Sequence, residues 1–154
     1  MVCTYTLTKA ENYMNLFDLS GRVVVMTGAT GVLGKSISSY LALQGARIAI
    51  LVRERSTLAG EALAEDIRAK GGDAASFVAD VMDKASLEAA YDKVIEKYGR
   101  VDVLMNAAGG NMPAATVPPD KTIFDLDTDA VKTVSDLNLF VFCVLFVTDH
   151  SGNG

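Results

Sequence analysis

The stretch RVVVMTGATGVLGKSISSYLALQG, residues 22–45, decides the fold of this chain. It opens with a β-rich apolar run suited to a buried strand, passes through a glycine-rich turn and continues with a helical period. Four side chains carry that period: Leu33, Ile37, Tyr40 and Leu41. Gly45 then supplies a stop signal, so the stretch predicts a strand, a tight turn and a helix in that order.

The rest of the chain repeats this alternation. Further strands are expected in RIAILV (47–52), AASFVAD (74–80) and VDVLMN (101–106). Helices are expected in STLAGEALAEDIRAKGG (56–72) and KASLEAAYDKVIEKYG (84–99), with Ser56 and Asp83 as N-caps. A loop rich in Gly, Pro and Ala follows from Ala107 to about Pro119, and a last helix begins near Asp127. The expected fold is α/β, a doubly wound parallel sheet of about four strands with flanking helices.

The composition excludes several classes of function. The net charge of -5, without clusters of Lys and Arg, argues against binding to nucleic acid or to an anionic membrane surface. The longest apolar run, Leu139–Val147, is far shorter than the roughly 20 residues that span a bilayer. Cys3, Cys143 and the lone His150 share no metal-ligand spacing, so we expect no metal site and a reducing, cytoplasmic environment.

The glycine turn TGATGVLG gives the clearest indication of a ligand. Gly28 permits a tight turn off the strand, Gly31 lets the backbone approach a pyrophosphate, and Gly34 lets the helix sit close to the strand. The free N–H groups and the positive dipole at the helix start then hold the phosphates. Since the turn joins a strand to a helix, we expect dinucleotide binding rather than a merely structural turn.

A competing phosphate motif is present only in part. Gly34, Lys35 and Ser36 form the ending of a nucleotide-hydrolase loop, but that loop needs a glycine where Ala29 stands. Gly28 lies one position too early, so the dinucleotide interpretation is preferred.

The residue after the second strand bears on cofactor choice. A dinucleotide enzyme selective for NAD usually places an acid there, to accept hydrogen bonds from the ribose hydroxyls. This chain has Arg53, whose guanidinium suits the 2′-phosphate of NADP. The alternatives are a solvated surface arginine, with Glu54 beside it, and use of NAD. We expect NADP(H) in preference to NAD(H).

Three further motifs extend the pattern in a fixed order. ADVMD follows the third strand, NAAGG follows the fourth, and DLNLF opens the last helix. With the glycine turn, roughly from Asn15 to Phe140, they resemble the short-chain dehydrogenase/reductase family. The resemblance implies the amino-terminal half of a Rossmann-type domain. It also implies that Asp80 holds the adenine, that Asn106 stabilises the sheet, and that Asn138 supports the catalytic proton relay. The cofactor-binding residues it implies are Gly28, Thr30, Gly31, Val32, Leu33, Gly34, Arg53, Asp80, Val81, Asn106, Ala107, Ala108 and Gly109.

Two stretches narrow the resemblance. NAAGGNMPAATV and LFDLSGRVVVMTGATGVLG are similar to the branch of D-mannonate oxidoreductases, or fructuronate reductases. This implies hydride transfer between NADP(H) or NAD(H) and a small sugar acid, in full-length relatives that form homo-oligomers. The turn departs from the commoner spacing G-x-x-x-G-x-G, which wants a glycine where Val32 stands. Asn111, in the same loop, is either a turn residue or a polar group near the substrate.

The family's catalytic serine, tyrosine and lysine would follow the start of the last helix, beyond Gly154. The pair Tyr5 and Lys9 has the Tyr-x-x-x-Lys spacing, but it precedes the first strand and is interpreted as chance. We therefore expect a chain that is inactive alone. The rival hypothesis is a non-catalytic dinucleotide-binding or interaction module.

The expected organisation has three parts. Residues 1–13 look like a disordered, dispensable extension, and 14–140 form a partial dinucleotide-binding domain. Residues 141–154 begin VFCVLFV, which loses the helical alternation and favours strand. This pattern suggests a frameshift or truncation near Phe140, and hence a fragment of low solubility.

Overall fold

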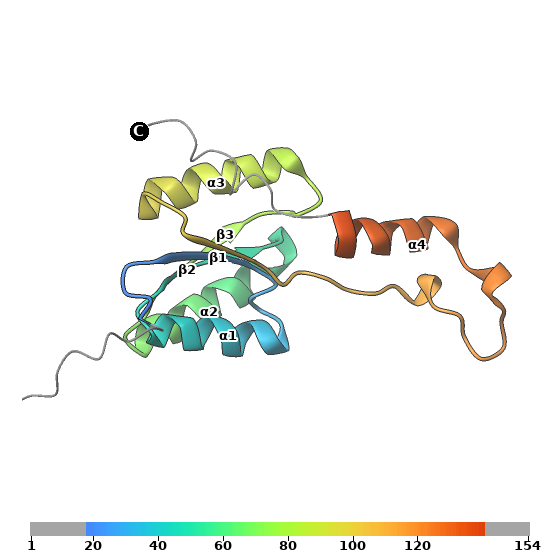
Figure 1. The fold of residues 1–154 in the computed structure, drawn as a ribbon, viewed down its shortest axis with the longest axis horizontal. Helices are drawn as coiled ribbons and strands as arrows, with labels where there is room; N and C mark the ends of the chain where they lie inside the picture. Colours follow the sequence, from blue (N-terminus) through green and yellow to red (C-terminus); the bar gives the residue numbers. More distant parts are fainter. Residues whose placement is uncertain (1–17, 141–154) are drawn as a thin grey trace, which may run out of the picture.

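The computed structural model describes residues 18–140, which form a parallel sheet with helices on both faces (Figure 1). Its strands are β1 (Val23–Thr27), β2 (Arg47–Val52), β3 (Asp73–Val78) and β4 (Val103–Asn106), and their order is β3-β2-β1-β4. All three pairings are parallel. The predicted four-stranded parallel sheet is therefore confirmed. The expected regions 1–13 and 141–154 lie outside the described residues.

Helices cover the sheet on opposite sides. Figure 1 shows α1 (Val32–Leu43) and α2 (Thr57–Ala69) on one face and α3 (Lys84–Tyr98) on the other. The short 3₁₀ helix η1 (Glu54–Ser56) joins β2 to α2. From β1 the chain continues to β2 and then β3 on one side of β1, and it then crosses back to place β4 on the other side. The direction of strand addition therefore reverses at the β1–β4 boundary. In such sheets, this reversal opens a crevice at the carboxyl ends of the strands.

Two apolar cores result from the alternation of side chains along the strands. Val24, Met26, Ile48 and Ile50 pack toward α1 and α2, together with buried residues of α2. Val23, Val25, Ala49 and Leu51 pack toward α3. Each fully buried aliphatic side chain stabilises the fold by about 1.5–3 kcal/mol. The central strands are therefore apolar on both faces, as the continuous runs in the sequence predict.

The amino-terminal ends of β1 and β4 are held together by Asp102. Its Oδ2 accepts a hydrogen bond from the backbone N–H of Val23 at 2.9 Å. Its Oδ1 accepts hydrogen bonds from the guanidinium groups of Arg22 and Arg100. The bond from Val23, with help from the two arginines, lowers the pKa of Asp102 to about 2. This carboxylate therefore links two strands that are 79 residues apart in the chain.

Helix α1 forms where the sequence predicts it, but of its four periodic side chains only Leu41 packs against the core. Leu33 and Tyr40 are 76% and 62% exposed, whereas the buried residues of α1 are Gly34, Ser38 and Ala42. Small side chains on that face let α1 lie close to the sheet, and Ser38 satisfies its hydroxyl by donating to the carbonyl of Gly34 at 2.8 Å.

The predicted N-caps have different outcomes. Asp83 accepts a hydrogen bond from the N–H of Ala85 at 3.0 Å, so its capping role in α3 is confirmed. Ser56 occupies the predicted N-cap position of α2, but its hydroxyl makes no capping hydrogen bond. The reason is that η1 precedes α2, and the hydroxyl of Thr57 donates to the carbonyl of Glu54 at 2.7 Å instead.

After β4 the chain forms an arm, residues 107–140, that extends away from the sheet (Figure 1). It contains the 3₁₀ turns η2 (Pro113–Ala115) and η3 (Ile123–Asp125), the helix α4 (Thr128–Ser135) and the π-helical turn η4 (Asp136–Phe140). Asp127 caps α4 by accepting hydrogen bonds from the N–H groups of Asp129 and Ala130, where the sequence predicts a helix start. Among residues 18–140, no helix is long and apolar enough to cross a bilayer.

Candidate functional site

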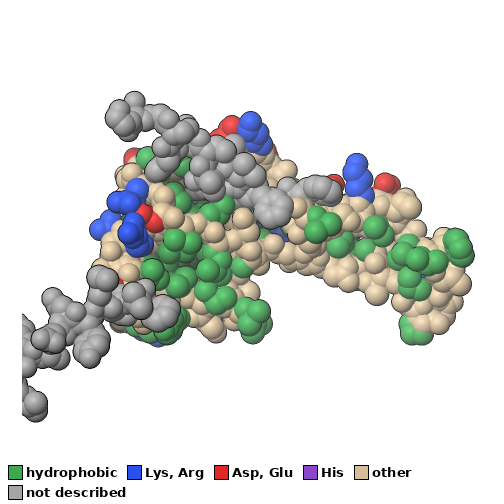
Figure 2. Space-filling view, viewed as in Figure 1, with side chains coloured by type: hydrophobic (Ala, Val, Ile, Leu, Met, Phe, Trp, Pro, Cys, Tyr) green, Lys and Arg blue, Asp and Glu red, His purple; other side chains and the backbone are tan. Residues whose placement is uncertain are grey.

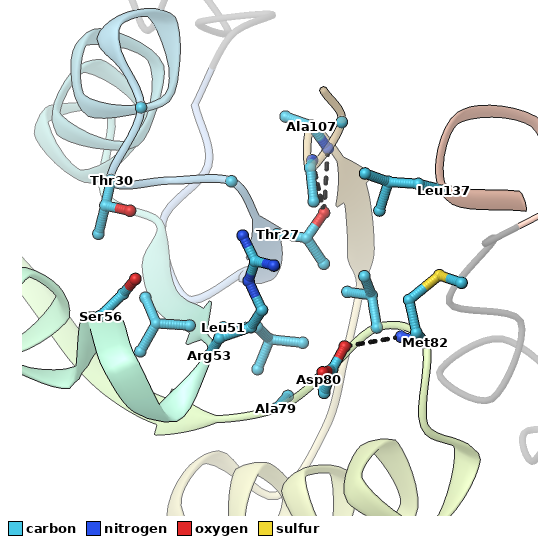
Figure 3. A pocket seen from close by; sticks show the side chains of 16 residues that line it. Thr27, Thr30, Leu51, Arg53, Ser56, Ala79, Asp80, Met82, Ala107 and Leu137 are labelled. Atoms are coloured by element: carbon cyan, nitrogen blue, oxygen red, sulfur yellow. Dashed lines mark hydrogen bonds between the residues drawn. The ribbon is translucent and has the colours of Figure 1, made fainter. Parts of the chain in front are cut away.

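A cavity of about 310 Å³ lies at the carboxyl ends of the strands, beside the β1–β4 boundary (Figure 3). We call it the main cavity. Its walls come from the turn after β1, the ends of β2 and β3, the turn after β4, and η4. The lining residues are Thr27, Gly28, Thr30, Gly31, Leu51, Val52, Arg53, Ser56, Ala79, Asp80, Val81, Met82, Ala107, Ala108, Gly109 and Leu137.

The glycines of the first turn create this opening. Gly28 has a φ of +68°, and a Cβ there would lie 2.3 Å from the carbonyl oxygen of Ala107. A Cβ at Gly34 would lie 2.2 Å from the carbonyl oxygen of Gly28. Both positions therefore require glycine, one for the turn and one for the close approach of α1. At Gly31 a Cβ would meet only the Gly28 carbonyl, at 3.2 Å, so the missing side chain leaves the backbone open.

Thr27 ties the first turn to the last one. Its side chain is 2% exposed, and its Oγ1 accepts hydrogen bonds from the N–H groups of Ala107 and Ala108 at 3.1 and 3.0 Å. Asn106, which ends β4, pairs with Thr27 across the sheet. The threonine directly before the glycine turn is the signal in the sequence that points to this contact.

The loop after β3 forms the acidic side of the main cavity. The Oδ1 of Asp80 accepts a hydrogen bond from the N–H of Met82 at 2.9 Å, and the N–H of Asp80 donates to Ser86 Oγ at 2.9 Å. The N–H of Ala79 donates to the carbonyl of Val52 at 2.8 Å. These bonds fix the carboxylate at the cavity, and its second oxygen makes no hydrogen bond within residues 18–140.

The end of β2 forms the basic side. Arg53 follows β2 directly and is exposed, and Ser56 lies three residues further on and is half-buried. Neither the guanidinium nor the Ser56 hydroxyl has a hydrogen-bond partner in the described part of the chain. The Thr30 hydroxyl on the opposite turn is likewise unpaired there. Figure 3 shows these three side chains around the same cavity. Three unpaired donors in one cavity suit a ligand that carries phosphate oxygens.

Asn138 positions the arm and stays outside the main cavity. Its Oδ1 accepts a hydrogen bond from the N–H of Gly110 at 3.2 Å, and its Nδ2 donates to the carbonyl of Gly110 at 2.8 Å. Nδ2 also donates to the carbonyl of Val134 at 2.7 Å. These bonds hold η4 against the turn after β4 and bring the neighbouring Leu137 to the cavity wall.

Not every residue expected at the cofactor lines the main cavity. Nine of the expected residues do: Gly28, Thr30, Gly31, Arg53, Asp80, Val81, Ala107, Ala108 and Gly109. Four others do not: Val32, Leu33, Gly34 and Asn106. Val32 and Leu33 belong to the exposed start of α1, at 90% and 76% exposure. The cavity is also lined by seven residues that were not predicted from the sequence: Thr27, Leu51, Val52, Ser56, Ala79, Met82 and Leu137.

Asn111 has a structural explanation. Its Nδ2 donates to Thr116 Oγ1 at 3.0 Å, and its Oδ1 accepts from the N–H of Met112 at 2.9 Å. Both ends of the amide are engaged inside the loop, so Asn111 acts as a turn residue. It also lines a shallow hollow of the arm, apart from the main cavity. In the region from 18 to 140, no three His, Cys, Asp or Glu residues are grouped to hold a metal.

Comparison with known proteins places this geometry among dehydrogenases. A family model described as short chain dehydrogenase matches residues 22–149. The uncharacterised oxidoreductase UxuB of Bacillus subtilis is 36% identical over 129 residues, which are 79% of this chain and 46% of that protein. D-threitol dehydrogenase of Mycolicibacterium smegmatis is 34% identical over 139 residues, which are 89% and 51% of the two chains. The chain therefore spans about half the length of the curated relatives it matches.

Solved structures share the fold. One is a Haemophilus influenzae protein assigned as a D-mannonate oxidoreductase, with bound NAD. It has a TM-score of 0.75 and 29% identity over 80% of this chain and 47% of the other. A metagenomic short-chain oxidoreductase in complex with NADP has a TM-score of 0.69 and 29% identity over 80% and 52% of the two chains.

Proposed function

The chain belongs to the short-chain dehydrogenase family, and from this we propose that it carries the cofactor-binding part of an NADP(H)-dependent oxidoreductase acting on a small sugar acid. The observation that supports the proposal best is the main cavity at the β1–β4 boundary. Its glycine turn, Asp80 and the Ala107–Gly109 turn meet there, at the place where sheets of this order bind dinucleotides.

The chemistry of the cavity walls suits a dinucleotide. The turn Gly28–Gly31 and the start of α1 would hold the pyrophosphate, because the first N–H groups of a helix lack partners within the helix and no Cβ stands in front of the backbone at Gly31. The unpaired carboxylate oxygen of Asp80 would accept a hydrogen bond from the adenine amino group, beside Val81. A bound nicotinamide dinucleotide supplies or accepts the hydride in such enzymes.

The preference for NADP rests on Arg53. Its guanidinium lines the main cavity and has no ion-pair partner among residues 18–140, so its charge is available to a ligand. A 2′-phosphate would receive charge-assisted hydrogen bonds from it, whereas the ribose hydroxyl of NAD would receive weaker ones.

The substrate class rests on similarity. The loop after β4 resembles that of sugar-acid enzymes, and a structural neighbour at 29% identity is assigned as a D-mannonate oxidoreductase. A relative at 34% identity acts on D-threitol, a polyol. We therefore propose a polyhydroxylated acid such as D-fructuronate or D-mannonate, with Asn138 holding the arm at the edge of the reaction site.

A second candidate function is dinucleotide binding without catalysis. Within residues 18–140, no tyrosine or lysine side chain lines the main cavity, so the described walls contain binding groups but no tyrosine to transfer a proton.

Two measurements on the full chain separate the candidates. NADPH and NADH are titrated against the protein by calorimetry, and turnover of D-fructuronate with NADPH is followed by absorbance. Turnover supports the oxidoreductase, and tight binding without turnover supports the binding module. Failure to bind either cofactor at millimolar concentration would contradict both.

A further inference from the structure

The turn between β2 and α2 separates its side chains into two groups. Arg53 is the N-cap of η1, and the N–H of Ser56 donates to the carbonyl of Arg53 at 2.7 Å. In a 3₁₀ turn, side chains three residues apart lie on the same side. Arg53 and Ser56 therefore point to one side, and the two residues between them point elsewhere.

The two groups of side chains line different cavities, except that Arg53 lines both. Arg53 and Ser56 both line the main cavity, and Glu54 and Arg55 do not. Glu54 and Arg55 line a neighbouring hollow, together with Arg53, Val78, Asp80 and Ser86. The carboxylate of Glu54, next to Arg53 in sequence, is therefore kept out of the main cavity, where it would repel a phosphate.

The hydroxyl of Ser56 is available to a ligand. It is half-buried at the cavity wall and makes no hydrogen bond with any residue of 18–140. Its neighbour Thr57 differs, because that hydroxyl already donates to the carbonyl of Glu54 at 2.7 Å. Figure 3 shows the side chains of Ser56, Thr30 and Arg53 around the same cavity. A hydroxyl without a protein partner can donate to a ligand without first breaking a hydrogen bond inside the protein.

We propose that Ser56 is a specificity-determining residue, whose hydroxyl donates a hydrogen bond to the 2′-phosphate of NADP beside the Arg53 guanidinium. The inference rests on the proposed function, and it extends the NADP preference from Arg53 alone to the turn that carries both Arg53 and Ser56. A phosphate offers three strong acceptor oxygens and a charge of about −1.5 to −2, enough for both donors at once. The ribose hydroxyl of NAD offers a single neutral group, so Ser56 favours NADP.

The test measures the dissociation constants of NADPH and NADH for the full chain and three variants. For Ser56→Ala we expect NADPH to bind about tenfold more weakly, the lower end for a hydrogen bond to a charged group, while NADH changes less than about twofold. Ser56→Asp places a carboxylate at the same point and should reverse the preference in favour of NADH. Thr57→Ala is the matched control and should leave the ratio of the two constants unchanged.

The outcomes separately test the role of Ser56, the position of the 2′-phosphate and dinucleotide binding itself. If Ser56→Ala weakens both cofactors equally, or neither, Ser56 has no part in selectivity although the cavity still binds dinucleotides. If Ser56→Asp keeps the NADPH preference, the 2′-phosphate lies elsewhere. If the unmodified chain binds neither cofactor, the proposed function fails and this inference fails with it. Thermal melting of each variant shows that a loss of binding does not reflect unfolding.

Discussion

At the scale of single residues, Arg53 and Arg55 stand two positions apart on one turn, yet only Arg53 lines the main cavity. We expect Arg53→Ala to weaken NADPH binding by about one to two decades and to change NADH binding little, because one charge-assisted interaction is lost. Arg55→Ala removes the same charge from the protein and should leave the selectivity unchanged. Calorimetric titration of both variants checks this, and equal losses for the two cofactors would exclude Arg53 from selectivity.

Asp102 gives a second residue-scale prediction, this one about acid stability. Since its folded pKa is lowered to about 2 from 3.8, its carboxylate stabilises the fold above pH 4, and that stability is lost as the pH falls toward 2. Asp102→Asn should lower the free energy of unfolding by about 1–3 kcal/mol at pH 7. Denaturant unfolding from pH 7 to 2 should show the difference shrinking below pH 4, and a constant difference would contradict the mechanism.

Much of the site could be predicted from residue types alone, and the missed residues share a reason. Gly28 and Gly31 mark backbone requirements, and Arg53 and Asp80 mark charges, which are visible in a sequence. Ser56 was not predicted because the direction of its side chain depends on the type of turn that follows β2. That turn is a 3₁₀ helix here, which the sequence does not distinguish from the first turn of an α-helix. Leu137 was missed because the π-helical turn brings it to the cavity from a distant part of the chain.

At the scale of elements, α2 packs on β3 through a contact between Gly60 and Ser76. A Cβ at Gly60 would lie 2.3 Å from Ser76 Oγ and 3.0 Å from a methyl of Val52. Gly60→Ala should therefore lower the free energy of unfolding by about 1–3 kcal/mol, because the helix must move away from the sheet. Chemical denaturation measures this, and an unchanged or raised stability would show that the interface has room.

Ser76 offers the complementary change at the same interface. Its Oγ is buried and has no hydrogen-bond partner in the described part of the chain. Ser76→Ala should raise the free energy of unfolding by about 1 kcal/mol, because it removes an unsatisfied polar atom. In the double variant with Gly60→Ala, part of the loss should be recovered, since the closest atom is gone. Strictly additive effects would show that the two positions do not touch.

Element order and type were predictable because strand runs and helical periods are local signals, but the orientation of α1 was not. Its periodic apolar side chains suggest one face, while the small residues Gly34, Ser38 and Ala42 form the face that meets the sheet. Close packing of a helix on a sheet favours small side chains at the contact, and hydrophobicity alone does not reveal that. Leu33, Tyr40 and Leu43 are then left at the surface, and Leu41 alone of the periodic residues packs against the core.

At the scale of the whole molecule, the exposed apolar surface of α1 lies beside an open edge of the sheet. Within residues 18–140, β4 pairs only with β1 and leaves its other edge without a strand. Figure 2 shows hydrophobic side chains gathered on this face, over α1 and the neighbouring edge of the sheet. On α1 they include Leu33, Tyr40 and Leu43, at 76%, 62% and 62% exposure. Exposed apolar patches and free strand edges are both sites of association between chains.

We therefore expect the chain to self-associate through this face at micromolar concentration, and charged substitutions on α1 to reduce the association. Leu33→Lys with Tyr40→Glu places opposite charges on positions that are already exposed, so the fold should keep its stability. Light scattering against concentration measures the association, and thermal melting monitors the fold. Lys93→Glu with Glu96→Lys on α3, away from the apolar face, is the matched control for charge. If the α1 variant associates as strongly as the unmodified chain and the control does too, the association uses another surface, and the open edge of β4 is the next to test.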